Sequence, residues 1–437
     1  MNIFIYDEFE PEAMAMMQAL YSRSAKSVKV HADKVKSSGS KKFMESFYVG
    51  YGHASIGDCG VTTLFIEGVS ILAAKALQDN ALYSGQETST RYIDFSEQEI
   101  LNPLSLPASK DIQEKWIEFY TNSSTPVKEY LKKLFPLKDG ESKQIWEKAI
   151  TARSFDILRG FLPAGATTQL SWTTNLRQAY DKLSQLQHHP LDEIKIIAEQ
   201  CLKQLKEKYP SSFSHRKDDA KEKYYDLLKK ELHYSDYEDR QFDNETLNYT
   251  TNIDNLELEK NALEAISQRP KRTELPKFLE RYGLYNTQFL LDYGSFRDLQ
   301  RHRNGLCRIP ILNNKHGFHP WYLNQLPQNI REKAELLLTE QFNAIDVLKN
   351  TSGVNDTTLQ YYYPMGCNVL CELVYSLPEM VYVIELRSGS TVHPTLRKIA
   401  KKMCEVIALN HPKLKLYADM NQDTWDIKRG TQDIQKK

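Results

Sequence analysis

Hydrophobic and polar positions along this chain predict a mixture of strands and helices. Residues 61–68 alternate as a half-buried strand does, and residues 70–80 consist of helix formers. The same order of strand and helix returns at residues 287–294 and 295–303. Further helical patterns are predicted over residues 108–135 with a break near Ser123–Pro126, and over residues 141–160, 175–187, 191–209, 329–350, 371–388 and 393–409.

The segments outside these elements carry weaker patterns. A short strand is predicted at Ile3–Tyr6, and the Lys- and Ser-rich segment Lys26–Lys42 is expected to be polar and mobile. Ser55 is followed by Asp58 three residues later, which is typical of a helix N-cap. Residues 211–260 are dense in charge and predict a solvated connector with some helix.

The order of elements repeats. Each half runs strand, helix, loop, long helix, Pro-containing break, helix, His-Pro and helix. A period of roughly 215 residues is too long for a solenoid repeat. We therefore expect an α/β (α+β) protein made of two tandem copies of one domain, each a sheet flanked by helices. The predicted boundaries are residues 1–210, a connector at 211–260, and residues 261–437.

Composition narrows the class of protein. Lys plus Arg equals Asp plus Glu at 57 each, so no overall basic field favours a nucleic-acid partner. Six cysteines in 437 residues indicate a reducing compartment. The N-terminus does not resemble a signal peptide, and the most apolar stretch contains Glu67 and Lys75. A soluble, cytoplasmic protein without a membrane partner is expected.

Some residue pairs look like metal ligands but lack a closed set of four at zinc spacing, so no metal site is predicted. They are His188 and His189, His316 and His319, and Cys367 and Cys371, the last pair being expected on the buried face of a helix. No Gly-rich phosphate loop is present in the sequence.

Four motifs resemble the flavin-dependent thymidylate synthase family. They are GHAS at 52–55, SGQETSTRY at 84–92, ILRGFLPAGATTQLSWTTNLR at 157–177, and RHR at 301–303. The resemblance covers most of residues 1–205, and residues 275–410 more faintly. It implies a nucleotide substrate, dUMP, and the cofactors FAD, NADPH and 5,10-methylenetetrahydrofolate.

The resemblance also implies roles for particular residues. Arg387 would act in catalysis at the uracil ring, and His53 would act beside the flavin. The expected substrate contacts are Glu87, Ser89, Arg91, Tyr92, Arg159 and Arg387; the expected cofactor contacts are Ser55, Glu87, Asn175, Arg177, Arg301, His302 and Arg303. Structural alternatives remain open: Ser55 could cap a helix, Arg387 could bind helix-terminal carbonyls, and the RHR triplet could be a solvated helix end.

Each half lacks roughly what the other retains. In the first half, the positions that correspond to RHR lie before SGQETSTRY and are occupied by Gln78, Asp79 and Asn80. In the second half, the loop after Arg303 has no Ser-x-Arg-Tyr motif. The counterparts of Arg159, Asn175 and Arg177 in the second half are Gln360, Ser376 and Pro378, and the counterpart of Arg387 in the first half is Leu186 or Gln187. Members of the resembled family are homotetramers whose active sites lie at subunit interfaces. The resemblance therefore implies one composite active site from both halves, in a homodimer that forms a pseudo-tetramer.

The expected function is that of a methyltransferase, the reductive methylation of dUMP to dTMP. Two alternatives remain. One is a related enzyme that modifies C5 of another uridine nucleotide, or that transfers a hydroxymethyl group. The other is a non-catalytic descendant that binds flavin or nucleotide. The chemistry would belong largely to the cofactor, since no cysteine lies in a matched motif.

Overall fold

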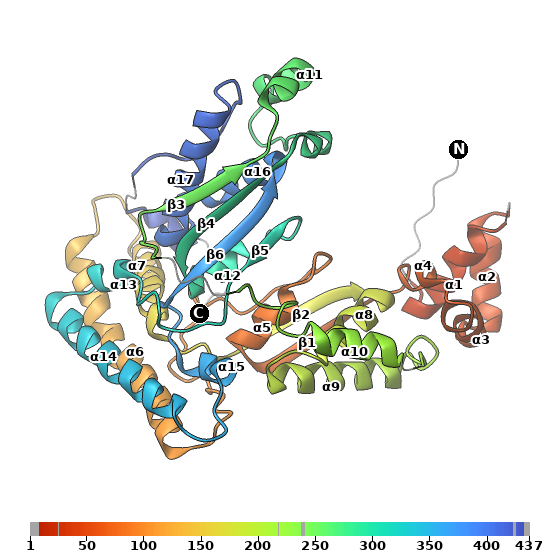
Figure 1. Ribbon diagram of the computed structural model, residues 1–437, viewed down its shortest axis with the longest axis horizontal. Coiled ribbons are helices and arrows are strands. Elements are labelled where there is room, and N and C mark those ends of the chain that lie inside the picture. The colour runs from red at the N-terminus through yellow and green to blue at the C-terminus, as the bar shows by residue number, and fades with distance from the viewer. Residues whose placement is uncertain (1–7, 25, 217, 237–240, 423–424, 432–437) are drawn as a thin grey trace. The chain divides into compact units, whose positions relative to one another are not determined.

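The computed structural model describes residues 8–24, 26–216, 218–236, 241–422 and 425–431, so the strand predicted at Ile3–Tyr6 lies outside the described residues. The mixed α/β fold predicted from the sequence is confirmed (Figure 1). The chain forms two compact units that interleave along the sequence. Unit 1 comprises Met1–Glu67, Ala76–Glu87 and Gln169–His233, and unit 2 comprises Gly68–Lys75, Thr88–Thr168 and Tyr234–Lys437. The boundaries predicted from the repeat stay a prediction.

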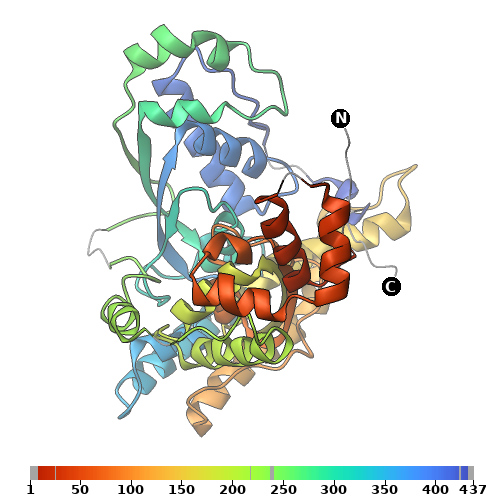
Figure 2. The ribbon, with the colours of Figure 1, turned by 90° about the vertical axis from the view of Figure 1, so that its right-hand side faces the viewer.

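Unit 1 begins with a group of helices (Figure 2). They are α1 (Pro11–Tyr21), α2 (Val28–Ser38), α3 (Lys41–Phe43), the π-helix η1 (Met44–Gly50) and α4 (Ala54–Gly57). The prediction that Lys26–Lys42 is a mobile segment was wrong. Ala32 and Val35 of α2 pack against Met16 and Met17 of α1, and this apolar stripe fixes a helix that also carries three lysines and two serines.

The remaining elements of unit 1 follow the predicted pattern. Most of β1 (Val61–Ser70) and β2 (Thr167–Asn175) lies in this unit, and the two strands pair. Helices α8 (Leu176–Leu186), α9 (Asp192–Lys208) and α10 (Asp219–Leu227) complete it. The helix predicted to start at Ser55 begins one residue earlier, and His53 is its N-cap residue. Ser55 is therefore inside α4 and does not cap it.

Unit 2 is built on a sheet whose described strands run in the order β3-β4-β6-β5, all antiparallel. The strands are β3 (Leu247–Thr251), β4 (Leu284–Asp292), β5 (Leu306–Arg308) and β6 (Asn368–Ser376). Figure 1 shows α16 (Leu377–Arg387) and α17 (Pro394–Asn410) lying along this sheet. Strand β4 pairs with β6 along its full length, from Leu284 opposite Ser376 to Asp292 opposite Asn368. Asp292 therefore stands at the end of a buried strand.

The other helices of unit 2 include two long ones that pack side by side, α6 (Pro107–Leu134) and α14 (Gln328–Lys349). The predicted break near Ser123–Pro126 was wrong, because α6 continues through Pro126. Val127 and Leu131 are buried beyond the proline, and their packing outweighs the hydrogen bond that Pro126 cannot donate. The shorter elements are α5 (Ile71–Gln78), which begins in this unit, α7 (Lys143–Leu158), η2 (Arg159–Phe161), α11 (Asn255–Ser267), η3 (Lys277–Tyr282), α12 (Tyr293–Leu299), α13 (Pro320–Asn324), α15 (Asp356–Leu359), η4 (Gln360–Tyr362) and η5 (Ile427–Thr431).

Two predictions about the second half gave the wrong type of secondary structure. Residues 371–376 were predicted as helix, but they form the end of β6 between β4 and β5. Cys371 is therefore buried in a strand and not on a helix face. The connector at 211–260 also contains β3, a short and largely exposed edge strand whose mostly polar residues carry little strand signal. No described helix combines the length and the apolar composition that a membrane span requires.

The two halves of the chain have matching element boundaries around the Pro-containing break. η2, β2 and α8 begin at residues 159, 167 and 176, and η4, β6 and α16 begin at 360, 368 and 377, a constant spacing of 201 residues. Within unit 2 the two breaks pair reciprocally. Ala164 N donates to Tyr363 O at 2.9 Å, and Met365 N donates to Leu162 O at 2.8 Å. This agreement is consistent with the predicted duplication, which stays a prediction.

Candidate functional site

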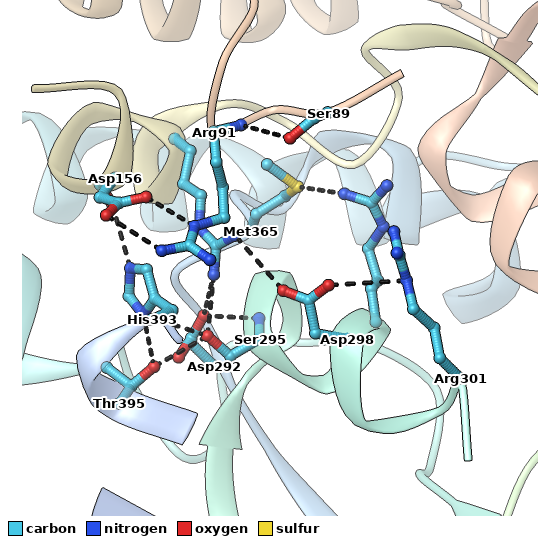
Figure 3. A network of polar contacts seen from close by, with 12 residues as sticks. Ser89, Arg91, Asp156, Asp292, Ser295, Asp298, Arg301, Met365, His393 and Thr395 are labelled. Carbon is cyan, nitrogen blue, oxygen red and sulfur yellow. Dashed lines mark hydrogen bonds and ion pairs between the residues drawn. The ribbon is translucent and has the colours of Figure 1, made fainter. Parts of the chain in front are cut away.

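Unit 2 brings together arginines that are far apart in the sequence (Figure 3). We call Arg91, Arg159, Arg301 and Arg387 the arginine cluster. Arg91 lies in the turn of the Ser-x-Arg-Tyr motif, Arg159 begins η2, Arg301 lies just after α12, and Arg387 ends α16. Both halves of the sequence thus contribute to one group of side chains. The carboxylates of Asp156, Asp292 and Asp298 lie among them.

Asp156 holds Arg91 in a bidentate ion pair. Arg91 donates from Nε to Asp156 Oδ1 at 2.7 Å and from Nη2 to Oδ2 at 3.2 Å, and Arg429 also donates to Oδ2. Burial alone would raise the pKa of Asp156, but the guanidinium groups of Arg429 and Arg91 hold that pKa well below its usual value. Arg91 is therefore positioned firmly, and its Nη2 also donates to the carbonyl of Thr391.

Arg159 lies almost wholly inside the protein, with 1% of its surface exposed. Its Nη2 donates to Ser295 Oγ at 2.8 Å and lies 3.8 Å from Asp292 Oδ2, and its Nε has no hydrogen-bond partner among the described residues. Asp292 also caps α12 by accepting from Ser295 N, and it accepts from the Tyr322 hydroxyl at 2.7 Å. The arginine is therefore fixed by the start of α12.

His393 links Asp156 to this group. Its Nδ1 lies 2.8 Å from Thr395 Oγ1 and 3.2 Å from Ser295 Oγ, and its Nε2 lies 3.2 Å from the carbonyl oxygen of Asp156. Burial, and then the charge of Arg159, hold the pKa of His393 well below its usual value. A neutral imidazole is consistent with a connecting role between two helices.

Asp298 lies between two arginines of the cluster, Arg159 and Arg301. Its carboxylate lies 3.6 Å from Arg301 Nε and 4.0 Å from Arg159 Nη1. Burial would raise its pKa, but the four members of the arginine cluster, Arg301 foremost, lower it to about 2. The side chain is 21% exposed, so an ionised carboxylate faces both the cluster and solvent.

The Arg301-His302-Arg303 triplet was predicted on a helix, but α12 ends at Leu299 and the triplet lies in the turn that follows. Arg387 donates from Nε to His302 Nε2 at 2.8 Å and from Nη2 to the carbonyl of Asp298 at 2.6 Å. Burial and the neighbouring Arg387 and Arg303 lower the pKa of His302 to about 3. A neutral His302 therefore accepts a hydrogen bond and orients Arg387.

The loop residues predicted to bind substrate lie beside Arg91. Ser89 Oγ accepts from Arg91 N at 3.2 Å, as Figure 3 shows, and stabilises the turn that presents Arg91. The ring of Tyr92 lies 5.7 Å from the guanidinium of Arg429. Arg303 donates to the carbonyl of Arg301 and is partly exposed.

The other predicted residues lie in unit 1, which is described by itself. His53 and Ser55 are exposed, and His53 Nδ1 lies 3.3 Å from Arg23 Nη2. Asp58 follows α4 and accepts two hydrogen bonds from Arg177, at 2.7 and 2.8 Å. This ion pair ties the short helix that carries His53 to α8.

Asn175 and Glu87 also have structural partners in unit 1. Asn175 caps α8, since its Oδ1 accepts from Gln178 N at 2.8 Å. Glu87 Oε2 accepts from Gln78 Nε2 at 2.6 Å. Gln78 is one of the residues that stand in place of the RHR triplet in the first half.

Sequence reasoning did not identify four residues of this group: Asp156, Asp292, His393 and Arg429. Asp292 had a detectable signal, because an aspartate three residues before a serine at a strand-to-helix junction is typical of an N-cap. Asp156 also interrupts the apolar run Phe155–Leu158, and such an acid usually needs a buried partner. Arg429 had no signal. Among the described residues no three His, Cys, Asp or Glu side chains form a set that could hold a metal ion.

Comparison with known proteins places these observations in context. The model of the family described as thymidylate synthase complementing protein matches residues 5–211. The chain is similar to a UPF0159 protein of Chlamydia pneumoniae, 26% identical over 445 aligned positions that cover 88% of this chain and 82% of the relative. It is also similar to a UPF0159 protein of Thermoplasma acidophilum, 23% identical over 86% of this chain and 88% of the relative. A flavin-dependent thymidylate synthase of Corynebacterium efficiens is 23% identical over 37% of this chain and 64% of the relative.

Proposed function

Since residues 5–211 of this chain belong to the thymidylate synthase complementing protein family, we propose that the protein is a thymidylate synthase-like enzyme. Its reaction would be the reductive methylation of dUMP to dTMP with methylenetetrahydrofolate and NADPH. One observation carries the proposal. The arginines that the family resemblance assigns to phosphate, uracil and flavin come from both halves of the sequence and meet around Asp298.

The nucleotide phosphate would bind at Arg91, with Ser89 as a hydroxyl donor. Guanidinium groups match the geometry of a phosphate dianion, and Arg91 is held in place by Asp156. Arg159 contributes its charge from a buried position, where its Nε lacks a partner among the described residues. Together Arg91 and Arg159 place fixed positive charge at the end of the Ser-x-Arg-Tyr loop.

Arg387 would stabilise negative charge that develops on the pyrimidine ring. Burial lowers the pKa of Arg387, and so do the nearby charges of Arg301 and Arg91, although Asp298 opposes them. A cation in such surroundings gains from an approaching negative charge more than a solvated one does. Its hydrogen bond to His302 fixes its direction before substrate binds.

The exposure of the Arg301-His302-Arg303 triplet is compatible with binding of a flavin dinucleotide. Arg301 is exposed and Arg303 is partly exposed in a turn, where their guanidinium groups would pair with a diphosphate. Bound flavin would supply the hydride, drawn from NADPH, and methylenetetrahydrofolate the carbon. His53, Ser55, Glu87, Asn175 and Arg177 remain proposed cofactor contacts of unit 1.

The test is growth of a thymidine-requiring bacterial strain, together with dTMP formation by the purified protein given dUMP, NADPH, FAD and methylenetetrahydrofolate. We expect wild type to rescue growth, and Arg387→Ala to lower kcat by about 100-fold or more, because it removes the charge that stabilises the transition state.

Arg331→Ala is the matched control, since Arg331 lies on the exposed face of α14 and pairs with Glu335. It should keep wild-type activity. Loss of rescue on changing Gln78, Asp79 and Asn80 but not Arg387 would contradict the composite site. Binding of dUMP or flavin without any dTMP formation would favour the non-catalytic descendant instead.

Asp298 favours one alternative, C5 modification of a different uridine nucleotide. Its ionised carboxylate lies within 4.0 Å of two arginines of the cluster and offsets part of their charge. A ligand less charged than a phosphate dianion would suit such a site better. Substituting uridine nucleotides of different charge for dUMP in the same assay tests this alternative.

A further inference from the structure

One fully buried imidazole lies between the two arginines that the proposed function assigns to phosphate. It belongs to His393, the N-cap residue of α17. On one side it contacts Asp156, whose carboxylate binds Arg91 (Figure 3). On the other side it contacts Ser295, which accepts a hydrogen bond from Arg159. All of these residues belong to unit 2, so one side chain has contacts that lead to both arginines.

The contact with Asp156 determines where the imidazole carries its proton. Nε2 of His393 lies 3.2 Å from the backbone carbonyl oxygen of Asp156, and a carbonyl oxygen can only accept a hydrogen bond. Nε2 is therefore the donor, and Nδ1 of a neutral ring is left as an acceptor. This bond ties the start of α17 to the end of α7, which is followed directly by Arg159.

The hydroxyls on the other side of the ring form a chain of hydrogen bonds with one direction. Arg159 can only donate, so Ser295 Oγ accepts from its Nη2 at 2.8 Å. Ser295 Oγ lies 2.8 Å from Thr395 Oγ1, which in turn lies 2.8 Å from Nδ1 of His393. Ser295 Oγ is farther from Nδ1, at 3.2 Å, so Thr395 is the better donor to the ring. Ser295 then donates to Thr395, and each hydroxyl accepts one hydrogen bond and donates one.

A second proton on the ring would disrupt this chain. Nδ1 would become a donor to Thr395, the Thr395 proton would turn toward Ser295, and the Ser295 hydroxyl would lose its acceptor. Burial, and then the charge of Arg159, hold the pKa of His393 well below its usual value. The ring is therefore neutral near pH 7, as the chain of hydrogen bonds requires.

The imidazole does more than fill space. The rings of Trp321 and Tyr322 lie against it, with centroids 4.6 and 5.6 Å away, and hold its plane. An apolar side chain of similar volume would keep these packing contacts. It would remove the donor to the carbonyl of Asp156 and the acceptor for the hydroxyl of Thr395, both of which are buried residues. Histidine at position 393 therefore orients polar groups as well as packing among them.

We propose that His393 is a positioning residue for the nucleotide phosphate, which fixes Arg91 and Arg159 relative to each other through a ring that carries its proton on Nε2. It acts on Arg91 through Asp156 and on Arg159 through the two hydroxyls, and it does not touch the ligand. The identity of that ligand rests on the proposed function, whereas the chain of hydrogen bonds does not. Arginines that are ordered before the phosphate arrives bind it more tightly, because binding then costs less conformational entropy.

The first experiment needs no ligand. Nitrogen-15 NMR of the histidine rings in the full-length protein, assigned by the signals that His393→Gln removes, reports which ring nitrogen carries the proton. We expect a neutral ring protonated at Nε2 between about pH 6 and pH 8. The side-chain Nε–H signals of Arg91 and Arg159 should shift or broaden in His393→Gln. A ring protonated at Nδ1 or at both nitrogens overturns the proposal, as do unchanged arginine signals.

The second experiment is equilibrium titration of the same protein with dUMP and, separately, with deoxyuridine, which lacks the phosphate. His393→Gln should weaken dUMP binding about tenfold or more, on the order of 1.4 kcal/mol, and leave deoxyuridine binding as in wild type. Thr395→Val keeps the ring but removes the hydroxyl that links it to Ser295. It should have the same kind of effect, and it serves as the second variant in case His393→Gln folds poorly.

His411→Gln is the matched control, because His411 is another buried histidine of unit 2 and its Nε2 lies 2.7 Å from the Tyr285 hydroxyl, outside the arginine cluster. It should bind both ligands as wild type does. Equal dUMP binding by wild type, His393→Gln and Thr395→Val overturns the proposal and leaves the proposed function intact. Equal weakening of dUMP and deoxyuridine also overturns it, since that pattern means a purely structural role. A wild type that binds no dUMP overturns the proposed function and, with it, the role of His393 toward phosphate.

Discussion

Asp298 sets the charge balance of the arginine cluster. Its pKa of about 2 means that the carboxylate is ionised throughout the pH range in which proteins are normally studied. It lies 4.0 Å from Arg159 and 3.6 Å from Arg301, farther than the roughly 2.8 Å at which a phosphate oxygen would bind a guanidinium group but close enough to repel one. A bound dianion therefore competes with an anion that the chain already supplies.

The variant Asp298→Asn should bind dUMP roughly tenfold more tightly than wild type, about 1.4 kcal/mol, because it removes one repulsive charge at short range. Equilibrium titration of dUMP at low and high salt measures the effect, which should shrink as salt rises. Asp346→Asn, on the exposed face of α14, is the control and should change nothing. Weaker dUMP binding by Asp298→Asn would mean that the carboxylate holds the arginines in place and does not oppose the ligand.

Single residues were predicted unevenly. Arg91, Arg159 and Arg387 could be proposed as site residues because each stands in a recognisable motif, and their roles stay a prediction. Their acidic partners could not, because an ion pair such as Arg91 with Asp156 joins residues whose proximity depends on the tertiary fold. The sequence also could not reveal that Arg159 is buried or that His302 is kept neutral by its neighbours.

Among the elements, the two Pro-containing breaks pack closely against each other. A Cβ added to Gly165 would lie 2.8 Å from Tyr361 O and 2.9 Å from Leu101 O, both backbone atoms that cannot easily move. The same glycine donates its N–H to Tyr361 O at 3.0 Å. The break in the first half therefore requires glycine where it approaches the second.

Gly165→Ala should lower the free energy of unfolding by about 2 kcal/mol, since the methyl group would push the two breaks apart. Denaturant unfolding measures it. Gly389→Ala is the matched control, because its Cβ would meet nothing closer than 3.6 Å, and a change within about 0.5 kcal/mol is expected. Equal stability of both variants would show that the close approach of the breaks is not a constraint.

Elements with a strong helical or strand periodicity in their sequence were predicted correctly. Elements whose type depends on the segments they pair or pack with were not. The strand at 61–68 and the helices at 141–160 and 329–350 are confirmed as β1, α7 and α14. The end of β6 was predicted as helix, because residues such as Leu373 and Tyr375 are apolar in either structure and only pairing with β4 distinguishes them. The early end of α12 likewise depends on the turn that delivers Arg301.

At the scale of the whole molecule, the arginine cluster draws on both halves of the sequence within a single compact unit. One chain can therefore supply all four arginines of the cluster to the predicted composite site. Whether two chains also associate as the predicted homodimer is a separate question, because the contacts of unit 1 that the resemblance assigns to flavin lie outside this cluster.

Bound flavin and oligomeric mass should be measured together on freshly purified protein, by absorbance and by light scattering. We expect about one FAD per chain in a dimer, since each chain contributes one arginine cluster that contains Arg91, Arg159, Arg301 and Arg387. Two FAD per chain would mean that the second half retains a working flavin site of its own. No flavin, even after FAD is added, would remove the redox mechanism.

The reciprocal pairing of the two Pro-containing breaks has a consequence for biosynthesis. Its hydrogen bonds join residues 162–165 to residues 361–365, which leave the ribosome at widely separated times. The segment carrying Arg159 must wait, unpaired, until most of the chain has been made. At the usual rates of protein synthesis, roughly 5–20 residues per second, nascent chains carry this segment unpaired for about ten seconds or more.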